Sequence, residues 1–155
     1  MIEHAVGSLK RTVAFRLSPG EDLLGGIQAV CEHYGIKSGV LLSGIGSLRS
    51  ARFFTPVVLP GTKAGYGYST PVEEAGPIEL ISVSGIIGEG ENGAPLLHVH
   101  CCFADGTGRT FSGHLIEGSE VLMTADLVIG ELDGIFMDRR YDPELDVYLV
   151  HPTQR

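Results

Sequence analysis

The feature that most constrains this chain is a pair of apolar, β-prone runs joined by a short Gly/Asp-rich segment. Residues 96–103 (LLHVHCCF) and 109–116 (RTFSGHLI) flank the sequence ADGTG at 104–108. Two such runs around a short glycine-containing loop predict an antiparallel β-hairpin. With the loop centred on Gly106, residue 98 would lie opposite residue 114, and residue 100 opposite residue 112.

Three of the six histidines fall on this predicted hairpin: His98, His100 and His114. Side chains alternate between the two faces of a strand, so His98 and His100 share one face and the directly opposed His114 joins them. Opposed Cβ atoms lie roughly 4.5–5.5 Å apart. Three imidazoles at that spacing can converge on one cation at metal–nitrogen distances of about 2.0–2.1 Å. The sequence therefore predicts a three-histidine site for zinc or another divalent transition metal.

This metal-site prediction competes with an ordinary explanation, because a histidine on a strand is more often a hydrogen-bonded surface or core residue than a ligand. It also depends on the register of the hairpin. A slip of one residue would send His114 to the opposite face of the sheet.

Composition is typical of one soluble globular domain spanning residues 1–155, with 43% hydrophobic and 19% charged residues. No apolar run approaches the ~20 residues of a membrane helix. The N-terminal sequence MIEHAVGSLKR lacks the apolar stretch of a signal peptide. Three cysteines, of which Cys101 and Cys102 are adjacent, do not make a disulfide framework. We therefore expect a protein of the reducing cytoplasm.

The segment Ser18-Pro19-Gly20 predicts the start of a helix, with Glu21 and Asp22 in its first turn. A single amphipathic stripe continues this helix from Leu23 to Tyr34, and Gly35 ends it. Gly25 and Gly26 inside it indicate either close packing against another element or simply poor helix propensity. Strands are expected at residues 12–17, 38–45, 49–55, 78–87, 96–103 and 109–116, with two short ones within 135–151. Residues 121–132 fit a strand or a helix, and their period-2 apolar row favours the strand.

The connections between these strands are rich in glycine and proline. Gly46 and Ser47 suggest a tight turn between two strands, and residues 56–77 a long loop or an edge excursion. The segment SGIGSL is not a phosphate loop, because the GK[ST] ending is missing. The pattern predicts an α+β fold: a largely antiparallel sheet of about seven strands with a few flanking helices.

Four ordered motifs carry a resemblance to a known family. They are RLxxGEDL, LLSGIGSL, ELxSxSG and HVHxxxxDxxGxxxxGHLxxGSxV. Together they resemble the PPC domain family, the plants and prokaryotes conserved or AT-hook-associated domains, over about residues 12–136. The set of four is far more specific than any single motif.

The resemblance implies a mostly antiparallel sheet with flanking helices, assembled as a homotrimer. Plant members join the domain to AT-hooks and take part in transcriptional regulation, whereas prokaryotic members are mostly the bare domain, labelled candidate DNA-binding proteins by analogy. Some members carry a histidine metal site in the hairpin region. Here that site corresponds to His98, His100 and His114.

Direct DNA binding is not expected from the sequence. The chain has no RGRP-type AT-hook, which is the minor-groove reader of the plant proteins. Its net charge of −8 also repels the phosphate backbone. Only a local basic patch, formed by Arg49, Arg52 and Lys63, would still allow this chain to bind DNA.

Two classes of function follow from these features. The first is a trimeric binding or regulatory protein with a structural or ligand-holding zinc. The second is a small metalloenzyme whose open zinc position activates water for hydrolysis. A general base would come from Glu79, Asp105 or Glu117, each of which is otherwise a solvated surface carboxylate.

Cys102 shares the strand parity of His98 and His100, so it is either a fourth ligand or a buried apolar cysteine. A cupin-like barrel is disfavoured because no glutamate follows His100 within four residues. We favour the binding protein and leave enzymatic activity open.

Overall fold

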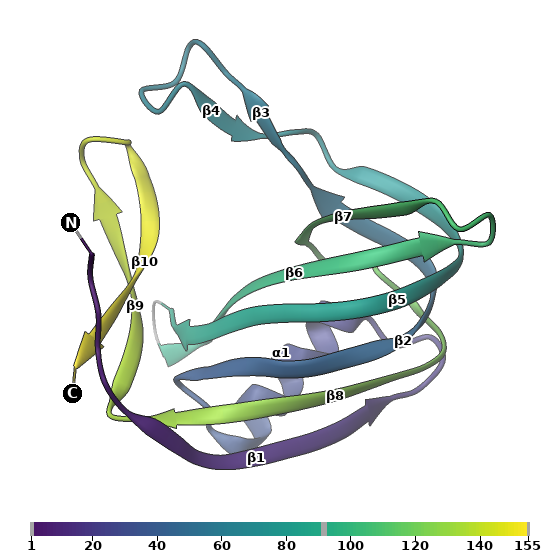
Figure 1. Ribbon diagram of the computed structural model, residues 1–155, viewed down its shortest axis with the longest axis horizontal. Coiled ribbons are helices and arrows are strands. Elements are labelled where there is room, and N and C mark those ends of the chain that lie inside the picture. Colours follow the sequence, from purple (N-terminus) through teal and green to yellow (C-terminus); the bar gives the residue numbers. More distant parts are fainter. Residues whose placement is uncertain (1, 91–92, 155) are drawn as a thin grey trace.

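The computed structural model describes residues 2–90 and 93–154 and consists of a large twisted sheet with one helix on one face (Figure 1). The elements are β1 (Ser8–Leu17), α1 (Leu23–Tyr34), β2 (Gly39–Phe54), β3 (Pro56–Val58), β4 (Tyr66–Tyr68), β5 (Val72–Glu89), β6 (Pro95–Asp105), β7 (Thr110–Leu115), β8 (Val121–Asp133), β9 (Ile135–Asp142) and β10 (Val147–Gln154). No helix in the described ranges is long and apolar enough to cross a membrane.

Eight strands form the main sheet in the order β1-β8-β2-β7-β6-β5-β9-β10, and β2 also pairs with β5. Among the described residues all ladders are antiparallel except the bridge between Glu89 and Asp138. The predicted antiparallel sheet is confirmed. The predicted few flanking helices are wrong, because the described chain forms a single α-helix and is otherwise mostly strand.

One long strand, β2, replaces the two strands and the turn predicted around Gly46 and Ser47. Gly46 lies so close to β8 that an added Cβ would sit 2.3 Å from the Thr124 carbonyl oxygen. The strand register shifts at this point, between Gly46 and Leu48. The glycine therefore permits a close approach of two strands and an irregularity in the ladder, and does not reverse the chain.

Helix α1 packs on the sheet through Leu23, Ile27 and Cys31, which are fully buried. Asp22 caps its first turn by accepting a hydrogen bond from the Gly25 N–H at 2.8 Å. Gly35 ends it in the left-handed conformation at φ 63°. The predicted helix is thus confirmed at its C-terminal end. Its start is two residues later than predicted, because Asp22 is the N-cap and does not lie in the first turn.

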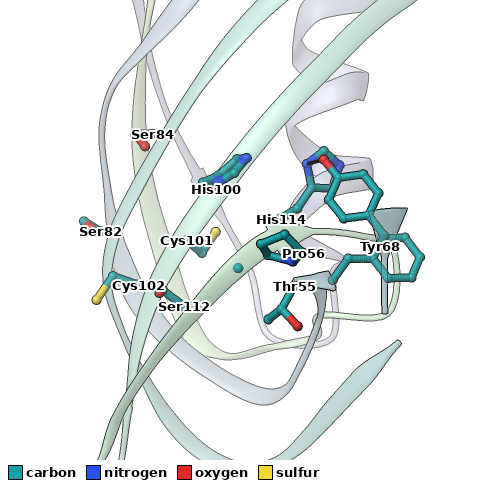
Figure 2. Close-up of a pocket in the computed structure, with 12 residues that line it drawn as sticks. Thr55, Pro56, Tyr68, Ser82, Ser84, His100, Cys101, Cys102, Ser112 and His114 are labelled. Atoms are coloured by element: carbon teal, nitrogen blue, oxygen red, sulfur yellow. Dashed lines mark hydrogen bonds between the residues drawn. The ribbon is translucent and has the colours of Figure 1, made fainter. Parts of the chain in front are cut away.

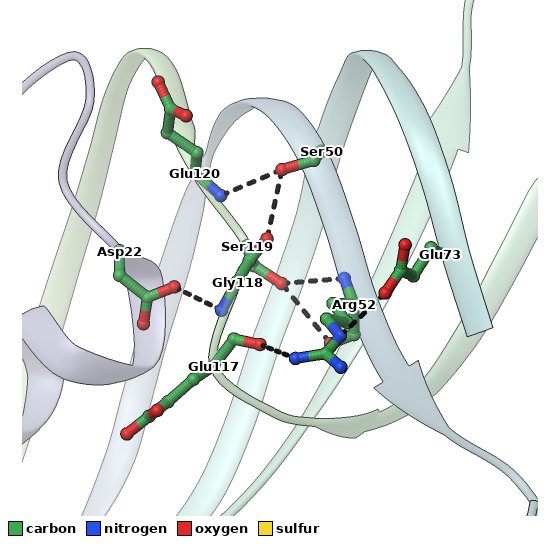
Figure 3. A network of polar contacts seen from close by, with 8 residues as sticks. All are labelled: Asp22, Ser50, Arg52, Glu73, Glu117, Gly118, Ser119 and Glu120. Carbon is green, nitrogen blue, oxygen red and sulfur yellow. Dashed lines mark hydrogen bonds and ion pairs between the residues drawn. The ribbon is translucent and has the colours of Figure 1, made fainter. Parts of the chain in front are cut away.

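A polar network joins the start of α1 to the loop between β7 and β8 (Figure 3). The second carboxylate oxygen of Asp22 accepts a hydrogen bond from Gly118 N–H at 2.7 Å. The buried Ser119 hydroxyl accepts one from Arg52 N–H at 2.9 Å, and the Arg52 guanidinium pairs with Glu73 at 3.0 Å. These contacts fix the chain where it leaves β7, and so they help to hold the histidine hairpin in place.

The core lies between α1 and the sheet, and it determines which way the hairpin side chains face. Val99, Cys101 and Phe103 of β6 are buried in that core. Because strand side chains alternate, His98 and His100 lie on the opposite, helix-free face.

Residues 56–77, predicted as a loop or an edge excursion, form the small β3–β4 hairpin and the beginning of β5. This β3–β4 hairpin projects beyond the main sheet (Figure 1). Its loop contacts the β9–β10 hairpin, where the Lys63 ammonium donates to the Pro143 carbonyl.

Candidate metal centre

Strands β6 and β7 form the predicted hairpin, but with a different register. His100 lies opposite His114 and Cys102 opposite Ser112. The predicted opposition of 98 to 114 and of 100 to 112 is therefore wrong by two residues. An even shift keeps every side chain on its predicted face, so all three histidines still share one face.

The loop of the hairpin explains the shift, because it is centred on Thr107 and not on Gly106. The Asp105 carboxylate accepts hydrogen bonds from the Thr107 N–H, the Thr107 hydroxyl and the Arg109 N–H. Gly108 takes a φ of +83° that side chains rarely adopt. The Thr107 hydroxyl first, then the Arg109 guanidinium and the Thr107 N–H, hold the pKa of the Asp105 carboxyl well below its usual range.

The three histidine rings converge. His98 Nε2 and His100 Nε2 are 3.1 Å apart. One nitrogen from each of the three residues lies within 4.8 Å of the others. The ring centroids are 5.0–5.3 Å apart. The predicted clustering of His98, His100 and His114 is confirmed.

The surroundings of His98 and His114 favour the neutral form of their rings. Partial burial lowers the pKa of His98 first, and the neighbouring His100 lowers it further. Burial likewise lowers the pKa of His114, with added effects from His98 and His100. A metal binds only the neutral imidazole, so the lowered pKa values of His98 and His114 keep these two rings in their ligand form over a wider pH range than an isolated histidine.

His114 is also held from the side of β2 and β4. Phe54 of β2 is its ladder neighbour, and the Phe54 ring stacks on Tyr68 of β4 at a centroid distance of 5.4 Å. The Tyr68 hydroxyl lies 3.3 Å from His114 Nδ1. The sequence analysis missed Tyr68, because no local spacing connects the β3–β4 hairpin to a histidine 46 residues later.

A pocket of about 470 Å³ opens beside His100 and His114. Figure 2 shows the His114 and Tyr68 rings side by side at one end and Cys102 towards the other. The lining residues are mostly neutral and many carry hydroxyl groups: Phe54, Thr55, Pro56, Tyr68, Ser82, Ser84, His100, Cys101, Cys102, Ser112, Gly113 and His114.

The remaining predicted candidates lie at different distances from the cluster. Cys102 lines the pocket with its side chain partly buried, but it is not one of the three converging residues. Glu79 pairs with Ala104, four residues along β6 from His100, which corresponds to about 13 Å of strand. Asp105 is engaged in the hairpin loop. Glu117 also lies outside the pocket lining.

The donor set fits a divalent transition metal. Two nitrogens that bind one tetrahedral zinc at about 2.0–2.1 Å lie about 3.3 Å apart. The His98–His100 separation of 3.1 Å is close to this value. The three candidate ligand nitrogens all lie within 4.8 Å of one another. Three imidazoles without a thiolate or carboxylate suit zinc, copper, iron or nickel better than magnesium or calcium.

Solved structures share this fold. The metal-containing protein AF0104 from Archaeoglobus fulgidus is 25% identical, with a TM-score of 0.81 over 96% of this chain and 99% of that one. A plant- and prokaryote-conserved protein from Pyrococcus horikoshii is 31% identical, with a TM-score of 0.75 over 92% and 94%. A protein from Ralstonia eutropha labelled as a candidate DNA-binding protein is 22% identical, with a TM-score of 0.72 over 88% of each chain, and shows the fold alone.

Curated relatives include the bifunctional protein GlmU of Synechococcus sp. strain JA-3-3Ab, which is 29% identical over 146 residues. The match covers 94% of this chain but only 21% of that protein. The chain therefore spans about a fifth of the length of the curated relatives it matches.

Residues 4–133 match the model of the Plants and Prokaryotes Conserved (PCC) domain. This range extends from the segment before β1 to the end of β8 and includes the histidine hairpin. The match agrees with the motif resemblance and with the shared fold of the Pyrococcus protein. The chain belongs to the Plants and Prokaryotes Conserved domain family.

Proposed function

We propose that this protein binds one divalent transition metal, zinc first among them, through His98, His100 and His114. The observation that carries the proposal is the convergence of three ring nitrogens within 4.8 Å on one face of the β6–β7 hairpin. The lowered pKa values of His98 and His114 support it, since metal binding requires neutral rings. So does the similarity to AF0104, which is described as metal-containing.

The site fits a regulatory protein that binds a ligand through its metal better than it fits a hydrolytic enzyme. A hydrolytic site needs a general base within hydrogen-bond reach of the metal-bound water. No carboxylate is among the described residues that line the pocket, and Glu79 and Asp105 lie elsewhere. The alternative of a small hydrolytic metalloenzyme therefore lacks the residue that its chemistry requires.

We further propose a homotrimer in a reducing compartment, the cytoplasm. Exposed apolar side chains on β1, β2 and β8 support self-association: Leu9, Leu42, Ile45 and Met123. Three free thiols, two of them buried, support the reducing compartment. Some structural neighbours are labelled as DNA-binding proteins. We do not extend direct DNA binding to this chain, because its net charge of −8 repels the phosphate backbone.

Elemental analysis of purified protein tests the metal site. We expect about one zinc per chain in the wild type and a loss of most of it in His98→Ala and His114→Ala. His33→Ala is the matched control, because His33 lies on α1 and contacts Tyr34. Wild-type metal content in both hairpin variants would overturn the proposal, as would a wild type that takes up neither zinc nor cobalt.

A further inference from the structure

The floor of the pocket beside the metal centre is a row of small hydroxyl side chains. On β5, Ser84 lies opposite His100 and Ser82 opposite Cys102. On β7, Ser112 lies opposite Cys102 from the other side. All three serines are exposed, and within the described chain their hydroxyls have no side-chain hydrogen bond. The row is therefore free to hydrogen-bond a ligand.

Among the described residues that line the pocket there is no Asp, Glu, Lys or Arg. Three neutral imidazoles leave a bound divalent metal with its full charge of about +2. The described lining residues contain no Asp or Glu that would neutralise it. An anionic group on the ligand supplies the missing charge at the open metal position.

The same lining discriminates between kinds of anion. Besides metal ions, proteins hold phosphate groups with guanidinium or ammonium groups or with the N–H groups of a helix N-terminus. Neither a Lys nor an Arg lines the described pocket, and the single helix packs on the other face of the sheet. A singly charged carboxylate needs no donors beyond the metal and fits this environment better than a phosphate.

The volume of the pocket and the distance from the histidines to the serines define the size of the ligand. Strands rise about 3.3 Å per residue, so Ser82 and Ser112 lie about 7 Å along the sheet from the His100 and His114 pair. A volume of about 470 Å³ is that of a small-molecule site. The stacked Phe54 and Tyr68 rings give the pocket one apolar wall.

We propose that the pocket binds a small hydroxycarboxylate, with its carboxylate on the metal held by the three histidines and its hydroxyl groups on Ser82, Ser84 and Ser112. This inference rests on the proposed metal site and adds the class of ligand to it. The serine row provides the selectivity, because a ligand without hydroxyl groups leaves it unpaired.

Cobalt(II)-loaded protein tests the proposal, since visible absorption reports both metal binding and a change of the fourth ligand. The titrants are glycerate, propionate, glycerol and inorganic phosphate. We expect glycerate to bind about tenfold more tightly than propionate, glycerol to leave the spectrum unchanged, and phosphate to bind more weakly than glycerate. Ser84→Ala and Ser112→Ala should each weaken glycerate binding by about 2- to 10-fold, leaving propionate binding and cobalt content unchanged. Ser43→Ala, an exposed serine on β2 outside this pocket, is the control.

The outcomes separate the two proposals. Absence of cobalt binding by the wild type overturns the metal site and this inference with it. Cobalt binding with equal affinities for glycerate and propionate, or with no effect of either serine variant, overturns the hydroxycarboxylate alone. Tighter binding of phosphate than of glycerate also overturns it, and leaves the metal site standing.

Discussion

His114 is held from three directions, by His100 across the β6–β7 ladder, by Phe54 on β2 and by Tyr68 from the β3–β4 hairpin. A ligand histidine is usually oriented by a hydrogen bond on its second ring nitrogen, which fixes both the tautomer and the ring. The Tyr68 hydroxyl, 3.3 Å from His114 Nδ1, is in position to do this and leaves Nε2 for the metal. Tyr68 is thus a positioning residue of the proposed site.

Replacing Tyr68 with phenylalanine should weaken metal binding by about 10-fold, the lower end of the range for such outer contacts. The ring stays to stack on Phe54, so only the hydroxyl is lost. Zinc competition against a chromogenic chelator measures the affinity, and Tyr66→Phe, an exposed tyrosine of the same hairpin, is the control. An unchanged zinc affinity in Tyr68→Phe would show that the hydroxyl does not orient His114.

The charge of Glu131 stabilises the fold and has no part in the proposed metal site. Burial would raise its pKa, but hydrogen bonds and positive charges from Lys10 and Arg11 outweigh that effect and hold the pKa below its ordinary value. A lowered pKa in the folded state means that the stabilisation is present above the unfolded-state pKa of about 4.3 and is lost as the pH falls through the folded-state value.

Glu131→Gln should therefore lower the free energy of unfolding by about 1–2 kcal/mol at pH 7. The difference from the wild type should shrink as the pH falls from about 5 to 3. Denaturant unfolding at a series of pH values measures this, with the exposed Glu144→Gln as the control. A wild-type advantage that is constant across this pH range would contradict the assignment.

At the scale of elements, the two glycines of α1 have different roles. An added Cβ at Gly26 would lie 2.5 Å from a methyl carbon of the buried Leu17 side chain on β1. At Gly25 the nearest atom is Asp22 Oδ1 at 3.4 Å, an ordinary contact. Close packing therefore explains Gly26, and nothing in the packing requires a glycine at position 25.

Gly26→Ala should lower the free energy of unfolding by about 1–2 kcal/mol, because overpacking against Leu17 exceeds the gain in helix propensity. Gly25→Ala should raise it by up to about 1 kcal/mol. The pair serves as its own control in a single series of denaturation curves. Equal effects of both substitutions would show that Leu17 moves aside without cost.

The elements that sequence reasoning predicted well were those set by local pattern. Helix α1 has an apolar stripe and a terminal glycine, and the face shared by His98, His100 and His114 follows from strand alternation alone. The register of the hairpin was wrong because it depends on the Asp105 side-chain hydrogen bonds, which loop length does not reveal. Tyr68 was missed because a long-range pairing of β2 with β7 brings it to His114.

Long-range contacts also explain the errors in strand assignment. Gly46 permits a close approach to β8, which sequence alone cannot distinguish from a turn. Met123 lies in a period-2 row with the buried Val121 and Ala125, yet it is 69% exposed because the ladder to β2 is irregular there. Such bulges are visible only once two strands are paired.

For the whole molecule, the exposed apolar side chains point to self-association. An added Cβ at Gly130 would contact both Leu9 and Leu42, so these two side chains are neighbours across β8. Leu42 is 48% and Ile45 55% exposed. Large apolar side chains grouped on neighbouring strands are typical of subunit interfaces.

We predict that light scattering returns a mass of about 50 kDa, three times the 16.5 kDa of one chain. Leu42→Glu and Ile45→Glu should reduce this mass towards that of the monomer, because a buried unpaired carboxylate is costly. Leu145→Glu, in the β9–β10 loop, should leave the trimer intact. A monomeric wild type at micromolar concentration would contradict the prediction.

The charge of the whole molecule leads to the last prediction, which concerns DNA. Binding to a duplex requires cations that displace condensed counterions, with a salt slope near −0.9 per phosphate neutralised. Eight lysines and arginines of the described chain are engaged in ion pairs with carboxylates. Two residues of the expected basic patch are among them, since Arg49 pairs with Glu120 and Arg52 with Glu73.

We therefore expect no binding to a random duplex below about 10 μM protein at ~0.15 M salt, measured by fluorescence anisotropy. Assembly makes the approach harder still, because three chains of net charge −8 carry −24. The double variant Glu73→Gln, Glu120→Gln frees both arginines and should bind DNA more tightly than the wild type at low salt. Sub-micromolar affinity of the wild type that weakens steeply as salt rises would contradict this prediction. It would mean that basic side chains gather on a surface of the assembly where ion pairs within one chain do not neutralise them.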